Sequence, residues 1–64
     1  MNLMPNKVKE RRLKLGKSQE WLAEQAGISR RYVIKIENNE VNPSVTLAKK
    51  IASSLGRLVE ELFI

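Results

Sequence analysis

Apolar residues recur every three or four positions along most of the chain, a spacing typical of amphipathic helices. Valine, isoleucine and aromatic residues never alternate with polar ones for long enough to indicate a strand. Glycine, proline, asparagine and serine separate the helical stretches. The pattern therefore predicts an all-α protein of five helices, which span residues 5 or 6 to 15, 19–26, 30–38, 45–55 and 58–63.

The predicted helix ends rest on residues that favour those positions. Ser18, Ser29 and Ser44 each precede a helix, where a hydroxyl can accept a hydrogen bond from the N–H groups of the first turn. Gly16 follows the first helix, where a left-handed conformation is common. Leu58 offers no side-chain cap to the last helix, and we expect none of the five helices to carry a capping box.

The same spacing gives each helix a face that should be buried. Two apolar residues three positions apart, Val33 and Ile36, point inward from the third helix. On the first helix, Arg12 shares a face with Val8 and Leu15. The other expected core residues are Leu22, Ala23, Ala26, Leu47, Ala48, Ile51, Ala52, Leu55, Val59 and Leu62.

Residues 19–37 predict two short helices packed across a tight turn. Ala23 is small where two backbones must approach closely, and Gly27 lies where the turn needs a positive φ. A basic outer face on the second of these helices would suit the major groove of DNA. The outward residues of that helix are Arg30, Arg31, Ile34 and Lys35.

The charge distribution favours a polyanionic partner. The 64 residues suffice for a single domain, 1–64. The net charge is +5, the pI is about 10.0, and nine of the twelve Lys and Arg residues precede Glu37. No apolar run approaches the ~20 residues that span a bilayer, and no signal-peptide core is present. We therefore expect a cytoplasmic protein without a membrane partner.

The composition offers little to an enzyme. The chain has no cysteine and no histidine, so disulfides are excluded and the usual zinc ligands are missing. The seven carboxylates are scattered, and neither a nucleophile–base pair nor a glycine-rich phosphate loop is present. We expect no catalytic activity, no metal and no cofactor.

Two arginines at the start of the third helix suggest a functional role. Arg30 and Arg31 lie at the positive end of the helix dipole, where a cation is unfavourable by about 0.3–1 kcal/mol. Phosphate oxygens or guanine acceptors would offset this cost. Lys35 lies further along the same face. Ile34 could pack on a thymine methyl or fill a gap beside the second helix, and the Tyr32 hydroxyl could reach a phosphate or lie on the surface.

Short motifs cover nearly the whole chain in a fixed order and spacing. They are Arg12, Leu15-Gly16, Ser18-Gln19, Leu22-Ala23, Gly27-Ile28-Ser29, Ile36-Glu37, Asn42-Pro43-Ser44, Leu55-Gly56 and Leu62-Phe63. Together they resemble the Cro/repressor (lambda repressor-like) type of helix-turn-helix domain. The resemblance implies a five-helix fold, a helix-turn-helix formed by the second and third helices, and double-stranded DNA as the partner.

The resemblance also implies roles for single residues. Gln19 would contact a phosphate and brace the recognition helix, and Asn38 matches a position where the backbone after that helix meets phosphate. Arg12 and Glu37 match a salt-bridged pair that ties the first helix to the end of the third, which would give the charge of Arg12 a partner. The positions that touch base edges or adjacent phosphates are Ser29, Arg30, Arg31 and Lys35.

Four positions depart from the family pattern. Asn39 stands where glycine is frequent, and Ile34 where a small or polar residue is common. Leu58 replaces the usual Ser or Thr cap of the fifth helix, and Trp21 occupies a position where a charged surface residue is usual. These departures leave the expected fold intact but bear on the surface contacts.

The sequence thus predicts a sequence-specific DNA-binding regulator, most simply a repressor that occludes promoters as a homodimer on an inverted repeat. We expect the dimer to form through Leu58, Phe63 and Ile64, because so short a helix cannot turn all its apolar side chains to the core. The alternative is a monomer in which Phe63 folds back onto the first helix near Met4 and Val8.

Two other functions stay open at this point. An antitoxin would neutralise a toxin and use DNA binding for autoregulation, and it would need Trp21 or the apolar segment 58–64 as its partner surface. A controller-type activator would present an acidic patch to RNA polymerase, for which Glu20 and Glu24 are the candidates.

Overall fold

The computed structural model describes residues 5–63, and these residues contain five helices and no strand. The helices are α1 (Val8–Lys14), α2 (Gln19–Ala26), α3 (Arg30–Glu37), α4 (Val45–Ser54) and α5 (Val59–Leu62). The predicted all-α, five-helix class is confirmed, and each helix lies within its predicted stretch. No helix of residues 5–63 is long and apolar enough to cross a membrane.

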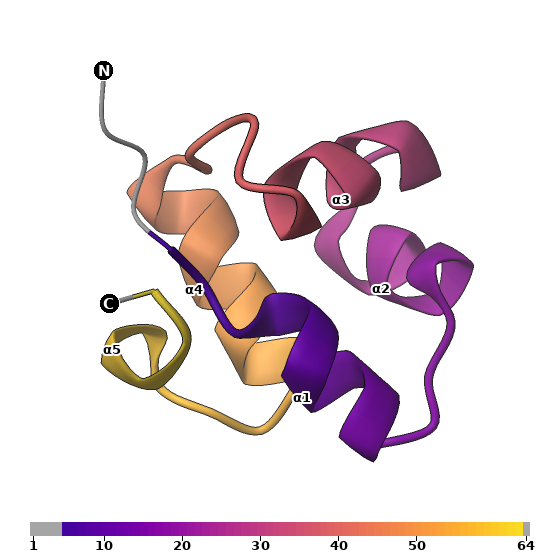
Figure 1. Cartoon of the computed structure of the whole chain (residues 1–64), viewed down its shortest axis with the longest axis horizontal. Coiled ribbons are helices and arrows are strands. Elements are labelled where there is room, and N and C mark those ends of the chain that lie inside the picture. The colour runs from indigo at the N-terminus through magenta and orange to yellow at the C-terminus, as the bar shows by residue number, and fades with distance from the viewer. Residues whose placement is uncertain (1–4, 64) are drawn as a thin grey trace.

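The helices assemble around α2 and α4. Helix α2 packs against both α3 and α4, α4 also packs against α5, and α1 packs against α3. Figure 1 shows α2 and α3 side by side, with α5 on the opposite side of the molecule from α3. The inner face of α3 is therefore covered, while its outer face borders solvent.

A small set of apolar side chains fills the space between the helices. Burial of each such side chain contributes about 1.5–3 kcal/mol. The two inward residues predicted for α3, Val33 and Ile36, are each only 1% exposed, so α3 is held firmly on its inner side. The largest fully buried side chains are Val8, Leu22, Val33, Ile36, Ile51 and Leu55.

All three predicted serine caps are confirmed. The Oγ atoms of Ser18, Ser29 and Ser44 each accept a hydrogen bond from the backbone N–H three residues later, at 2.9, 3.1 and 3.1 Å. Each such cap contributes about 1 kcal/mol to helix stability. The starts of α2, α3 and α4 are thus set by local sequence.

Helix α1 is shorter than predicted at both ends. It begins at Val8 because the Asn6 side chain folds over the helix start, where its Oδ1 accepts from the Val8 N–H at 3.1 Å. The helix ends at Lys14, and the chain turns at Gly16, which has φ +68°. Leu15 is 39% exposed, so its assignment to the buried face is wrong.

Helix α5 has a cap that the sequence analysis missed. The backbone N–H of Leu58 donates to Oε1 of Glu61 at 2.8 Å, which is the carboxylate half of a capping box. The expectation that no helix has such an element is therefore wrong for α5, although Leu58 has no side-chain acceptor for the other half. The Lys7 N–H donates to the carbonyl of Leu62 at 2.8 Å and attaches α5 to the start of α1.

The turn after α3 depends on an asparagine in the left-handed conformation. Asn39 has φ +60°, the one positive φ outside glycine in the described part of the chain. Its Oδ1 accepts from Nδ2 of Asn6 at 3.0 Å, and the same amide nitrogen donates to the carbonyl of Ile36 at 2.8 Å. Asparagine thus tolerates the turn and also links the end of α3 to the segment before α1.

We predict that Asn39→Ala lowers the free energy of unfolding by about 1–3 kcal/mol, because alanine strains the left-handed turn and loses the hydrogen bond to Asn6. Asn39→Gly keeps the turn, so we expect a loss below about 1 kcal/mol. The measurement is urea unfolding followed by circular dichroism. The exposed neighbour Asn38, with φ −88°, is the matched control, and Asn38→Ala should change stability by less than about 0.5 kcal/mol. Equal losses for the two alanine variants would contradict this account.

Candidate nucleic-acid interface

The outer face of α3 carries the basic residues that the sequence placed there. Arg30, Arg31 and Lys35 are exposed, whereas Tyr32 and Ile34 are half-buried. The first turn of α3 contains no acidic residue, so the two arginines add their charge to the positive end of the helix dipole. This end of α3 is therefore a strong attractor for anions.

The two ends of α3 differ in which hydrogen-bond donors remain available to a partner. At its start, Oγ of Ser29 already accepts from the Tyr32 N–H, which leaves the hydroxyl proton as a donor. At its end, the backbone N–H groups of Asn38 and Glu40 donate to the carbonyls of Ile34 and Lys35. The backbone N–H of Asn38 is thus occupied. Its exposed side chain, whose Nδ2 also donates to Oε2 of Glu40 at 3.4 Å, is the group that can reach a phosphate.

A buried ion pair fixes the last residue of α3 to α1. Arg12 Nε donates to Glu37 Oε2 at 2.7 Å and Nη2 donates to Oε1 at 3.2 Å, the bidentate geometry that suits guanidinium and carboxylate. The two side chains are 7% and 2% exposed. Arg12 Nη1 also donates to the carbonyl of Lys17 at 2.8 Å, which ties the α1–α2 turn to the pair. This is the pairing that the resemblance implied.

Gln19 joins this network from the first position of α2. Its Nε2 donates to Glu37 Oε1 at 3.1 Å, so three hydrogen bonds from two helices converge on one carboxylate. The half-buried side chain braces α3 and keeps its carbonyl oxygen and one N–H for another partner.

Trp21 makes a cation–π contact that the sequence did not predict. The half-buried indole packs against the hydrophobic core, and the Lys17 ammonium lies 5.0 Å from the ring centroid. Such a cation–π contact contributes about 0.5–1 kcal/mol near the surface. The ring therefore covers the core and holds a cation beside the start of α2.

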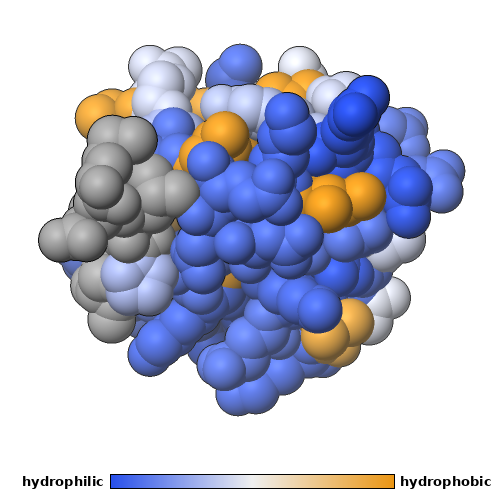
Figure 2. All heavy atoms as spheres, turned by 45° about the horizontal axis from the view of Figure 1, so that its top comes forward, coloured by the Kyte–Doolittle hydropathy of each residue, from blue (hydrophilic) through white to orange (hydrophobic). Residues whose placement is uncertain are grey.

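The face drawn in Figure 2 is largely hydrophilic, and its hydrophobic residues lie in small separate spots. This is the side reached by turning the top of Figure 1, with the α3–α4 loop, toward the viewer. A hydrophilic surface of this kind matches a hydrated nucleic acid better than an apolar partner.

Leu58 and Phe63, two of the residues expected at a dimer interface, flank α5 on the opposite side of the molecule from α3. Leu58 is 61% exposed, and Ile64 lies outside the described residues. Phe63 is half-buried and lines a groove of about 210 Å³ against the start of α4, beside Pro43 and Val45. Phe63 thus packs beside α4, whereas the monomer alternative placed it near Val8 and Met4, and Met4 is also outside the described residues.

Two residues with roles in the structure were not predicted from the sequence: Val45 at the α5 side and Asn6 at the end of α3. Val45 is 71% exposed, the most exposed of the large apolar side chains in residues 5–63. Its position directly after the cap Ser44 was the available signal, because the first residue of a helix seldom faces the core. Asn6 gave no comparable signal, since its partners lie 30 and 33 residues away.

Comparison with known proteins places this geometry among helix-turn-helix domains. The helix-turn-helix family model (Cro/C1 type) matches residues 8–62. An uncharacterised transcriptional regulator of this type from Methanothermobacter thermautotrophicus is 43% identical over 58 residues, which are 89% of this chain and 84% of the relative.

Two solved structures are also similar. The restriction-modification controller protein C.AhdI from Aeromonas hydrophila has a TM-score of 0.83 and 37% identity, over 89% of this chain and 86% of its own. The N-terminal DNA binding domain of SinR from Bacillus subtilis has a TM-score of 0.76 and 34% identity, over 84% and 80%.

We predict that Arg12 and Glu37 are energetically coupled. Arg12→Met or Glu37→Gln alone leaves a buried charge without its partner and should lower the free energy of unfolding by about 3–5 kcal/mol. The double variant should lose much less than the sum of the two, measured by urea unfolding of the DNA-free protein. Gln19→Ala removes only one bond to Glu37, so it serves as a milder control. Additive losses would show that the pair is not coupled.

Proposed function

The chain belongs to the helix-turn-helix family, and on that premise we propose that it is a sequence-specific regulator that inserts α3 into the major groove of duplex DNA. The observation that carries this proposal is the outer face of α3. Three exposed cations lie on a helix whose inner side is fully buried and whose end is fixed through Glu37. A rigid helix with a basic outer face can hold its side chains against base edges.

Each outward residue of α3 has a chemical role in this proposal. Arg30 and Arg31 can each present two N–H groups to O6 and N7 of guanine, worth about 1–3 kcal/mol of discrimination per pair. Lys35 lies one turn later and reaches a base or a phosphate. The half-buried Ile34 offers an apolar edge to a thymine methyl. Tyr32 contributes its hydroxyl to an adjacent phosphate.

Phosphate contacts would flank the recognition helix. Gln19 lies at the first position of α2, where free N–H groups and the helix dipole favour an anion. Its remaining amide proton can donate to phosphate while the other holds Glu37. Ser29 and Asn38 have side-chain donors at the two ends of α3. These contacts set the register of α3 on the duplex without reading sequence.

We propose that two copies of the chain bind an inverted repeat as a dimer. The surface through which they contact each other is formed by Val45, Leu58, Val59 and Phe63. Val45 and Leu58 are the exposed apolar residues of this surface. Val59 lines both the groove beside Phe63 and a second groove beside Leu58, so the two grooves adjoin at this residue. Exposed apolar area of this kind favours association. A twofold pair could set the recognition helices about 34 Å apart, one turn of DNA.

Occlusion of a promoter by the dimer is the simplest mode of action, and the cytoplasm is where such a regulator meets the chromosome. Activation is the second candidate, favoured by the similarity to the controller protein C.AhdI. Glu20 and Glu24 are both exposed on α2 and are suited to meet polymerase. A promoter–reporter fusion with the operator in place separates the two: repression lowers expression, and activation raises it and is lost in Glu20→Gln and Glu24→Gln.

We predict that Arg31→Ala lowers affinity for the operator about tenfold to a hundredfold and leaves affinity for scrambled duplex nearly unchanged. Gln19→Ala should weaken both duplexes alike, because it contacts phosphate and braces α3. The measurement is fluorescence anisotropy on labelled duplexes at several salt concentrations. Wild-type log affinity should fall with log salt by ~0.9 for each phosphate neutralised.

Lys50→Ala is the matched control, because Lys50 is an exposed cation on α4 that lines neither groove of the proposed dimer surface. It should leave operator affinity within about twofold of wild type. Equal losses on both duplexes for Arg31→Ala would assign that residue to phosphate, and a flat salt response would overturn the DNA-binding proposal.

We predict that Val45→Lys and Leu58→Lys each shift the protein from dimer to monomer in sedimentation equilibrium. The charge would have to be buried in the proposed apolar interface, which is strongly unfavourable. Both side chains are exposed, so the fold should persist in circular dichroism. Thr46→Lys is an exposed control on the same helix turn and should leave the dimer intact. A wild-type protein that stays monomeric at high concentration would contradict the dimer.

A further inference from the structure

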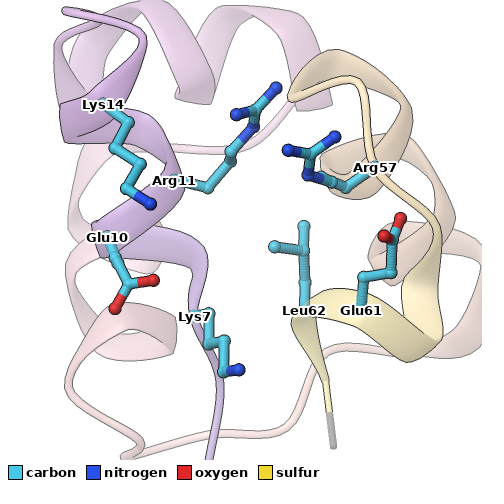
Figure 3. Close-up of a pocket in the computed structure, with 7 residues that line it drawn as sticks. All are labelled: Lys7, Glu10, Arg11, Lys14, Arg57, Glu61 and Leu62. Atoms are coloured by element: carbon cyan, nitrogen blue, oxygen red, sulfur yellow. The ribbon is translucent and has the colours of Figure 1, made fainter.

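A second concentration of positive charge lies in a pocket between α1 and α5, away from α3. The pocket holds about 190 Å³. Three cationic residues come from the α1 side and one from the turn before α5, and Leu62 lies between the two sides in Figure 3. The residues that line it are Lys7, Glu10, Arg11, Lys14, Arg57, Glu61 and Leu62.

Arg11 is held in place for this pocket. Its Nε donates to the carbonyl of Leu55 at 3.0 Å, which fixes the guanidinium at the end of α4. This hydrogen bond does not use the two terminal nitrogens of the guanidinium. In Figure 3 the side chains of Arg11 and Arg57 reach toward each other from opposite sides of the pocket. Two guanidinium groups thus border the same space, one of them already oriented.

The cations of this pocket are not neutralised within it. Four cationic and two acidic side chains line the space. Within residues 5–63, one side-chain ion pair has an N–O distance below 4.0 Å. This pair is Arg12–Glu37, which lies outside the pocket. Oε1 of Glu61 accepts from the Leu58 N–H and serves as the cap of α5. An excess of like charge around one solvent-open pocket favours the binding of an anion there.

The proposed DNA contacts do not use this charge. Arg11 and Lys14 are three residues apart and share one face of α1, and Lys7, the residue before this helix, lines the same pocket. Arg12 points from a different face toward Glu37 at the end of α3. The pocket therefore lies between α1 and α5 and is separate from the outer face of α3.

We propose that this pocket is a binding site for a phosphate group. Guanidinium groups present paired N–H donors that match the oxygens of a phosphate, and the lysines add point charges around them. The volume fits a phosphate with at most a small substituent, since pockets for larger ligands begin at about 300 Å³. The phosphate can belong to a small free molecule or to the backbone of a nucleic acid.

The test is titration of isotope-labelled protein with inorganic pyrophosphate at constant ionic strength, without DNA, followed by amide chemical shifts. Wild type should show saturable binding with shifts confined to α1, the turn at Arg57 and α5. Arg57→Gln should weaken binding about tenfold to a hundredfold, because it removes charge-assisted hydrogen bonds. The Arg57 side chain is exposed and its backbone contact is retained in this variant, so the fold should be unchanged.

Lys9→Gln is the matched control for charge, because Lys9 is an exposed lysine of α1 that does not line the pocket. It should leave the pyrophosphate affinity within about twofold of wild type. Lys14→Gln, a second exposed pocket residue, should weaken binding as Arg57→Gln does. Absence of saturable binding, or equal losses for Lys9→Gln and Lys14→Gln, would overturn the proposal, since either result means diffuse charge without a site.

The source of the phosphate follows from a second titration, with unrelated duplex DNA. If Arg57→Gln loses pyrophosphate binding but keeps its duplex affinity, the site serves a small free ligand. If it loses both in proportion, the site holds a backbone phosphate. The pyrophosphate titration contains no DNA, so its outcome does not depend on whether the protein is a DNA-binding regulator.

Discussion

The arrangement of the other helices around α3 depends on the hydrogen bonds that the buried carboxylate of Glu37 accepts. This carboxylate accepts two hydrogen bonds from Arg12 on α1 and one from Gln19 on α2. A buried charge is tolerated only when its partners are present, so the last turn of α3 must stay beside both helices. Arg12 in turn holds the α1–α2 turn through the Lys17 carbonyl. One carboxylate thereby joins three helices, and the alternative positions of α3 would each leave a charge unpaired.

This constraint matters because the rest of the domain is small. A chain of about this length buries only ~60% of its unfolded surface, and its core here rests on a few apolar side chains. Hydrophobic burial of Val33 and Ile36 holds α3 against the core but is not directional. The ion pair and the hydrogen bonds of Asn6 at the end of α3 add direction. Together they give a helix whose outer side chains have fixed positions, which the proposed reading of base edges requires.

Arginines illustrate how the helical face decides the role of one residue type. Arg12 is buried in the ion pair, while its neighbour Arg11 turns about 100° further and reaches the end of α4. Arg30 and Arg31 are exposed at the start of α3, where the dipole makes cations unfavourable without an anionic partner. Arginines thus contribute to a buried ion pair, to the exposed face of α3 and to the α1–α5 pocket.

The sequence by itself determined the local features: the helical class, the serine caps, the positive φ of Gly27 and the buried and exposed faces of α3. These features depend on residues within about four positions, so spacing and side-chain type suffice to predict them. The family resemblance added Arg12 and Glu37. Only the tertiary structure decided that Asn6 meets Asn39, that Gln19 meets Glu37, and that Val45 and Phe63 border one groove. Such contacts join residues 18 to 33 positions apart or lie across two helices. Their existence depends on how the core packs, which no local pattern encodes.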